Sequence, residues 1–180
     1  ILNEEVLKKT VERIIRPTMR EMVRRGMPFT GVLYAGLMIK DSNPRLVEYN
    51  VRFGDPECQV LMMRLGGQIL DALLSTANGE LSDVKINWAE DHSITVVMAS
   101  NGYPGSYKKG SQINGLANLP SDSNSICFHA GTMEKNGKIV ANGGRVLNIT
   151  TRAETLIEAQ KSAYEMIATI DWPEGFYRKD

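Results

Sequence analysis

Three polar residues at alternate positions, Glu48, Asn50 and Arg52, form the part of this chain best suited to chemistry. Side chains alternate across a β-strand, so an extended segment over residues 46–53 turns all three to one face. Carboxylate and amide oxygens are hard ligands suited to Mg²⁺, which is usually shared between one or two protein groups and a substrate phosphate. A guanidinium beside such a metal can fork onto a phosphate or carboxylate oxygen. The spacing therefore allows a metal site at Glu48 and Asn50, beside which Arg52 could act in catalysis and substrate binding.

The opposite face of the same segment is apolar, which supports the strand prediction. We expect it to anchor the segment on a core through Val47, Tyr49, Val51 and Phe53. An ordinary solvent-facing strand shows the same alternation of polar and apolar residues. Spacing alone therefore leaves a plain structural role open.

Asp55 and Pro56 follow the strand and have the pattern of a helix start. Asp is a preferred N-cap and Pro a preferred first helical residue, so we expect one helix from there to residues 78–79. An N-cap contributes about 1 kcal/mol, which would fully explain Asp55. Its carboxylate could instead hold the amino group of a small substrate, and both roles are compatible through different oxygens.

Sequence motifs along most of the chain, including the segment over residues 46–53, resemble those of a known family. EYNVRFGDPECQ is preceded by TGVLYAGLMI and followed, in order, by SNGYPGSYKKG, CFHAGT, NGGRVLNIT and the closing FYRKD. Through these strings nearly the whole chain resembles glycinamide ribonucleotide synthetase, also called phosphoribosylamine–glycine ligase. The resemblance implies an α+β fold. Residues 1–86 would be the C-terminal half of an ATP-grasp domain, with antiparallel strands and helices, and residues 87–180 a small antiparallel β-rich domain with one long helix.

The resemblance also implies a reaction and its participants. ATP would phosphorylate the carboxylate of glycine, and 5-phosphoribosylamine would displace phosphate from this acyl phosphate to give glycinamide ribonucleotide in de novo purine synthesis. Glu48 and Asn50 would hold Mg²⁺ or Mn²⁺, while Arg52, Gly54, Asp55 and Arg145 would meet substrate. The family's N-terminal portion, which includes the rest of the nucleotide clamp, is not in this sequence. We therefore expect the chain alone to be an inactive fragment.

Two other functions remain open. Other ATP-grasp carboxylate–amine ligases also end a strand with a carboxylate, an asparagine and an arginine, so the substrates could differ. Alternatively, the chain could be a non-catalytic β-rich binding module that retains old active-site residues.

Composition narrows the class of protein. The 180 residues carry 21 basic and 21 acidic side chains, which argues against a nucleic-acid scaffold. The arginines near the start are expected on the solvated face of a helix. No apolar run reaches the length of a membrane span, and no secretory segment is visible. Cys58 and Cys127 lack zinc-site spacing and are expected to be reduced thiols, as in a cytoplasmic protein.

Local signals predict the elements that position these residues. The first helix should begin at Asn3, kink or break into two helices at Pro17, and end at Gly26. Expected strands lie at residues 31–39, 46–53, 93–99, 126–130, 138–140 and 145–149. Expected turns lie at Asn43–Pro44 and Asn136–Gly137, and Thr151 or Thr155 should start the last helix.

Three further features have both a functional and a plain interpretation. Lys108 and Lys109 lie among glycines that could grip a phosphate or simply form a turn. The pair Gly143–Gly144 could allow a ligand to approach Arg145 or could form a bulge. His129 is expected to be a hydrogen-bonded structural residue rather than a catalytic one.

Overall fold

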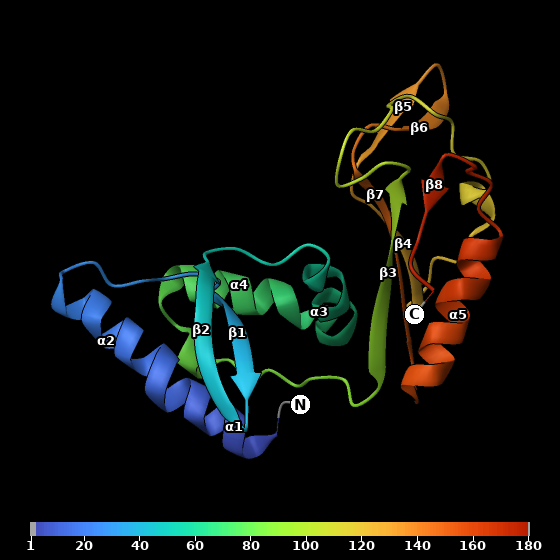
Figure 1. The fold of residues 1–180 in the computed structure, drawn as a ribbon. Coiled ribbons are helices and arrows are strands. Elements are labelled where there is room, and N and C mark those ends of the chain that lie inside the picture. The colour runs from blue at the N-terminus through green and yellow to red at the C-terminus, as the bar shows by residue number, and fades with distance from the viewer. Residues whose placement is uncertain (1–2, 180) are drawn as a thin grey trace. The chain divides into compact units, whose positions relative to one another are not determined.

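The computed structural model describes residues 3–179 and confirms the α+β class (Figure 1). Two compact units divide the chain. The first contains Ile1–Gly54 and Leu70–Lys85, and the second contains Asp55–Ile69 and Ile86–Asp180. Within residues 3–179, no helix is both long and apolar enough to cross a membrane.

The first unit pairs a long, interrupted helix with a β-hairpin. Its helical elements are α1 (Glu4–Thr10), the π-helical turn η1 (Val11–Ile15), α2 (Arg16–Arg24), most of α4 (Gln68–Asn78) and the 3₁₀ turn η2 (Leu81–Asp83). The hairpin strands are β1 (Tyr34–Lys40) and β2 (Asn43–Asn50). Tyr49 fastens β2 to α2 through a 2.9 Å hydrogen bond between its hydroxyl and Thr18 Oγ1.

The predicted ends of the first helix are confirmed. Asn3 Oδ1 accepts a hydrogen bond of 2.9 Å from the Val6 amide, as an N-cap should. Gly26 follows the last turn with a φ of 73°, a left-handed conformation that costs glycine little. Near Pro17 the chain does not separate into two helices, because η1 lets the helix continue through this region. The five arginines expected on its solvated face are exposed: Arg13, Arg16, Arg20, Arg24 and Arg25.

The hairpin turn lies two residues earlier than predicted. Asp41 and Ser42 form it with φ values of 49° and 56°, so it is a left-handed two-residue turn built without glycine. Asn43 and Pro44 are already in β2, paired with Lys40 and Ile39. The prediction of a turn at Asn43–Pro44 was therefore wrong.

For the strand predicted over residues 46–53, both the position of its C-terminal end and the burial of its apolar face were predicted wrongly. β2 ends at Asn50, so Arg52 lies beyond the strand. Gly36 pairs with Glu48 while Leu37 pairs with Leu46, which leaves Val47 as the extra residue of a β-bulge. Val47 and Val51 are 66% and 70% exposed. A bulge breaks strict alternation, and for this reason only part of the expected apolar face is covered.

The predicted helix over residues 57–78 is two helices. α3 (Glu57–Leu65) ends at Gly66, which has a φ of 55°, and α4 starts again at Gln68. Pro56 precedes α3, and no side chain caps its first turn. The N-cap prediction for Asp55 was therefore wrong, and helix capping does not explain its carboxylate.

The second unit is built on a four-stranded antiparallel sheet in the order β4-β7-β3-β8. These strands are β3 (His92–Ser100), β4 (Ser125–His129), β7 (Arg145–Ala153) and β8 (Gly175–Phe176). A separate hairpin joins β5 (Thr132–Lys135) to β6 (Lys138–Ala141) through the predicted Asn136–Gly137 turn, and η3 (Leu116–Asn118) is a short 3₁₀ turn. β5 and β8 were not predicted, and β7 is longer than expected.

Helix α5 (Leu156–Ala168) packs on β3 and β7 and closes the core of this unit. Thr155 begins it with a capping box, in which Thr155 Oγ1 and the Glu158 carboxylate each accept from the other residue's amide. Helix α3 also packs on β3 and β7. The buried core residues are Val96, Met98, Ile113, Ala141, Val146, Leu147, Ile149, Ala163, Met166, Ile167 and Trp172.

Candidate functional site

Glu48 and Asn50 meet on one face of β2. Asn50 Nδ2 donates to Glu48 Oε1 at 3.1 Å, and both side chains are accessible to solvent. Gly36 lies opposite Glu48 on β1, and a Cβ there would come within 3.2 Å of Glu48 Cγ. The hairpin therefore leaves room for the glutamate stem and presents two polar heads side by side.

The donor set of this pair fits a hard divalent cation. Two adjacent ligands in an Mg²⁺ octahedron lie about 3 Å apart, because each bond is about 2.1 Å long. The Glu48 and Asn50 heads are separated by a similar distance of 3.1 Å. The amide needs only to turn its oxygen in place of its nitrogen, two atoms that a hydrogen-bond network alone distinguishes. Residues 3–179 hold no cluster of three or more His, Cys, Asp or Glu side chains placed for a metal. A metal at this pair would therefore need oxygens from water or substrate.

Arg52 lies on an exposed bend after β2. Its Nη1 donates to the backbone oxygen of Phe53 at 2.8 Å. That bond uses one of the five N–H donors of the guanidinium, which fixes the group while others can face an anion.

Asp55 belongs to a second cluster of polar side chains, which lies within the second unit and includes Arg145 and Asn148. Arg145 Nη2 donates to Asp55 Oδ2 at 2.9 Å, and Asn148 Nδ2 lies 3.5 Å from Asp55 Oδ1. The Asp55 and Arg145 side chains remain 44% and 39% exposed. The structure thus brings together two predicted substrate residues that are far apart in the sequence and leaves their polar heads accessible.

Sequence reasoning missed Asn148. The residue is fully buried on β7, directly between two fully buried apolar residues, Leu147 and Ile149. An amide in the middle of an apolar strand is the signal that could have indicated it, because buried polar groups need a partner.

The glycines before Arg145 serve packing. A Cβ on Gly144 would overlap the ring of Tyr103, so that ring lies directly against the backbone. Met98 pairs with Leu147 and Ala99 with Arg145, which makes Val146 the extra residue of a bulge. The bulge therefore lies at Val146, after the two glycines, and a role of this segment in ligand approach stays a prediction.

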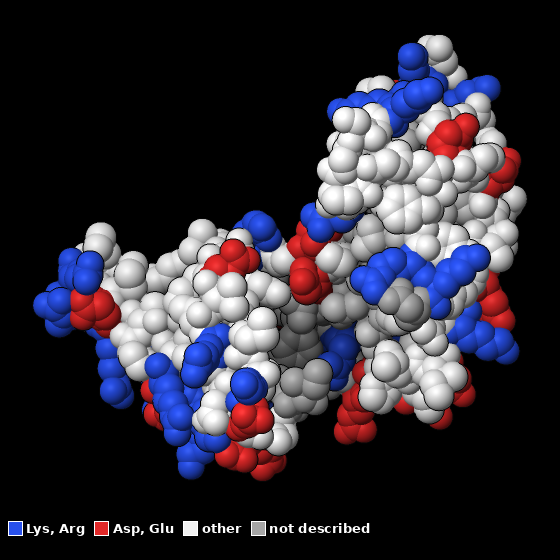
Figure 2. All heavy atoms as spheres, in the orientation of Figure 1, with Lys and Arg blue, Asp and Glu red and all other residues white. Residues whose placement is uncertain are grey.

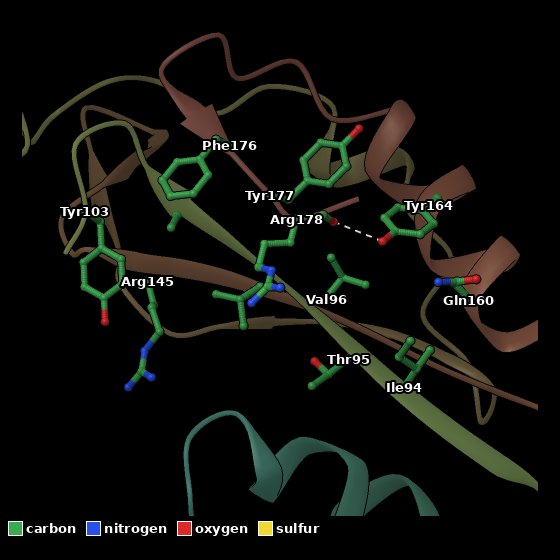
Figure 3. A pocket seen from close by; sticks show the side chains of 12 residues that line it. Ile94, Thr95, Val96, Tyr103, Arg145, Gln160, Tyr164, Phe176, Tyr177 and Arg178 are labelled. Atoms are coloured by element: carbon green, nitrogen blue, oxygen red, sulfur yellow. Dashed lines mark hydrogen bonds between the residues drawn. The ribbon is translucent and has the colours of Figure 1, made fainter. Parts of the chain in front are cut away.

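A cavity of about 370 Å³ lies in the second unit beside Arg145 (Figure 3). Tyr103 and Arg145 line one end, and Gln160 and Tyr164 of α5 line the other. The Tyr164 hydroxyl donates to the backbone oxygen of Arg178 at 3.0 Å, which ties the last described residues to α5. The walls are largely apolar and aromatic, and the guanidinium groups of Arg145 and Arg178 are the cationic groups in the lining.

The remaining candidate residues, Lys108, Lys109 and His129, lie exposed at the surface. Lys108 and Lys109 are exposed, and Lys108 borders a hollow of about 460 Å³ with Tyr107. His129 is exposed, and its Nδ1 lies 2.9 Å from Thr132 Oγ1, so the expected hydrogen bond is present. Lys and Arg side chains are interspersed with Asp and Glu around α1 and α2 (Figure 2).

Both cysteines are free thiols, as predicted. Burial raises the pKa of the Cys127 thiol to about 11. Burial, and then the Asp55 carboxylate, raise the pKa of the Cys58 thiol. Since the thiolate is the reactive form, neither residue is prepared to act as a nucleophile near neutral pH.

Comparisons with known proteins agree with this arrangement. Residues 1–58 match the profile described as "Phosphoribosylglycinamide synthetase, ATP-grasp (A) domain", and residues 93–180 match "Phosphoribosylglycinamide synthetase, C domain". A phosphoribosylamine–glycine ligase of Brucella melitensis is 52% identical over 180 residues, which are all of this chain and 42% of that relative. A chloroplastic phosphoribosylamine–glycine ligase of Arabidopsis thaliana is 49% identical over 184 residues, covering all of this chain and 35% of its own length.

A solved structure is also similar. The crystal structure of a phosphoribosylamine–glycine ligase from Thermotoga maritima superposes with a TM-score of 0.87 at 34% identity, covering all of this chain and 44% of that one. The chain therefore spans less than half the length of these relatives.

Proposed function

Because the chain belongs to the phosphoribosylglycinamide synthetase family, with the C-terminal part of its ATP-grasp domain and its C domain, we propose that the longer protein carrying it is an ATP-dependent ligase. This ligase would join glycine to 5-phosphoribosylamine. The observation that carries the proposal is the match of both family domains in order along one chain, together with 52% identity over all of its residues. The residues 1–180 alone are expected to be inactive, because the relatives are more than twice as long.

The chemistry has two balanced steps. A carboxylate oxygen of glycine attacks the γ-phosphorus of ATP, the bond to the β–γ bridging oxygen breaks, and ADP leaves. The amine of 5-phosphoribosylamine then attacks the acyl carbon, and phosphate leaves with that carboxylate oxygen while the amine gives up a proton. Such transfers depend on positioning and on neutralising charge rather than on a protein nucleophile.

Glu48 and Asn50 are the residues we propose to hold Mg²⁺ or Mn²⁺. When bound, the ion would neutralise charge on the ATP phosphates. Asn50 and Glu48 already lie within hydrogen-bond distance of each other. Arg52 would donate to the transferring phosphoryl group, since its guanidinium is exposed and held by the Phe53 carbonyl.

Asp55 and Arg145 are the residues we propose to bind glycine, and we propose that Gly54, which directly precedes Asp55, contacts substrate as well. Free glycine is a zwitterion, with one ammonium and one carboxylate. A half-exposed carboxylate and guanidinium 2.9 Å apart offer the matching charges in one place. Asp55 would accept from the ammonium and Arg145 would donate to the carboxylate, so each charge of the ligand replaces one half of the existing ion pair.

Three further assignments belong to the same proposal. We place the domain boundary between residues 86 and 87, inside the region between the two family matches. ATP, glycine, 5-phosphoribosylamine and the N-terminal portion of the enzyme would be its partners. Two free thiols support a cytoplasmic location.

Isotope transfer tests the proposal. Glycine labelled with ¹⁸O in its carboxylate should give phosphate that contains one ¹⁸O per turnover of the full-length ligase. Unlabelled phosphate would rule out an acyl phosphate. ADP release that ignores glycine but follows another carboxylate would favour a different ATP-grasp ligase, and no ADP release with any carboxylate would favour the binding module.

A further inference from the structure

We propose that Asn148 is a positioning residue that holds the Asp55 carboxylate in the orientation needed to receive the substrate amine. This inference rests on the proposed function of Asp55. Asn148 itself would not touch substrate, because its side chain is fully buried.

The location of Asn148 makes it rigid. β7 lies between β3 and β4, and Asn148 pairs with Val97 on one side and Phe128 on the other. Its neighbours on β7, Leu147 and Ile149, are fully buried as well. A side chain at the centre of a three-strand arrangement has few alternative rotamers, so its amide has a fixed direction.

The partners of Asn148 are what distinguish it from other buried polar residues. Thr150 lies two residues further along β7, and its hydroxyl bonds to Thr95 Oγ1 at 2.8 Å. The Oδ1 of Asn148, in contrast, has no hydrogen-bond partner among residues 3–179. Its Nδ2 points to Asp55 Oδ1 at 3.5 Å, the outer limit of a hydrogen bond. A buried amide with an unsatisfied oxygen destabilises the fold. We therefore attribute the presence of Asn148 to the contact of its nitrogen with the Asp55 carboxylate.

The two partners of Asp55 are unequal. Arg145 holds Oδ2 with a partly exposed side chain, which extends away from the sheet in Figure 3. Asn148 lies beside Oδ1 from inside the sheet. If Arg145 turns to a substrate carboxylate, Asn148 is the partner that remains, and it keeps Asp55 aimed at the ammonium group of the same ligand.

The test measures KM for glycine, KM for ATP and kcat in the full-length ligase. Asn148→Leu removes the amide at similar size, and Asn148→Thr provides a second, smaller replacement that cannot reach Asp55. Both should raise KM for glycine about tenfold and leave KM for ATP unchanged. Thr150→Val is the matched control, because it removes a buried polar group from the same strand without touching Asp55. It should leave KM for glycine unchanged.

A double variant separates this proposal from the proposed function. In an Asp55→Asn background, Asn148→Leu should add no further change in KM for glycine. An effect of Asp55→Asn with none from either Asn148 variant would overturn the role of Asn148 alone. An equal rise in KM for Thr150→Val would overturn it too. An unchanged KM for glycine in Asp55→Asn would overturn the assignment of Asp55 itself, and the positioning role with it.

Discussion

Asp55→Asn is the substitution for which structural and functional roles predict the most different results. The change keeps the size of the side chain and removes its charge. The ion pair that it breaks, with Arg145 at 2.9 Å, is between side chains 44% and 39% exposed. Pairs this exposed contribute about 0–1 kcal/mol to folding. We therefore expect Tm of the full-length ligase to fall by no more than about 4 °C.

The expected effect on substrate is larger. A hydrogen bond between charged groups contributes about 1.5–3 kcal/mol. If Asp55 accepts from the glycine ammonium, its loss should raise KM for glycine about 10- to 150-fold, since each 1.36 kcal/mol is tenfold. The assay is steady-state ADP release at saturating ATP, with thermal unfolding measured on the same preparations. A KM for glycine within twofold of the unsubstituted enzyme, whatever the Tm, would refute the reasoning.

Three other changes have definite expected outcomes. Glu48→Ala should abolish most metal-dependent ADP release. It should change Tm by no more than about 2 °C, because the side chain is exposed. A parallel loss of activity and folding would show a structural role instead. Gly144→Ala should lower the free energy of unfolding in urea titrations by about 1–3 kcal/mol, since its Cβ would overlap the Tyr103 ring. Gly67→Ala is the control and should not destabilise the protein, because a Cβ at Gly67 would meet no atom within 4 Å. Cys127, with a pKa of about 11, should be protonated at pH 8 and react with iodoacetamide only as the pH approaches 11, so that fast alkylation at pH 7 would contradict its burial.

Features specified by neighbouring residues were predictable from the sequence. The cap at Asn3 and the turn at Asn136–Gly137 each depend on a few adjacent positions, and each is present. The last helix begins at Thr155, one of two predicted starts, because Glu158 lies three residues on and completes a capping box. The alternation of β2 was predictable only up to its bulge, because the register that creates a bulge is set by the partner strand.

The polar group around Asp55 was only partly predictable. Asp55 and Arg145 were each candidates, but they are 90 residues apart in sequence, and no local signal pairs them. The N-cap pattern of Asp55 and Pro56 favoured a local role that the long-range ion pair displaces. Asn148 was missed because its role depends on what faces it across the fold.

The most direct test of the account is ADP release by the full-length ligase with 5-phosphoribosylamine, given glycine, bicarbonate or formate in turn. We predict release that requires glycine and fails with the other two carboxylates. Release with bicarbonate or formate and none with glycine would contradict the assignment of the substrate, and with it the role proposed for Asp55 and Arg145.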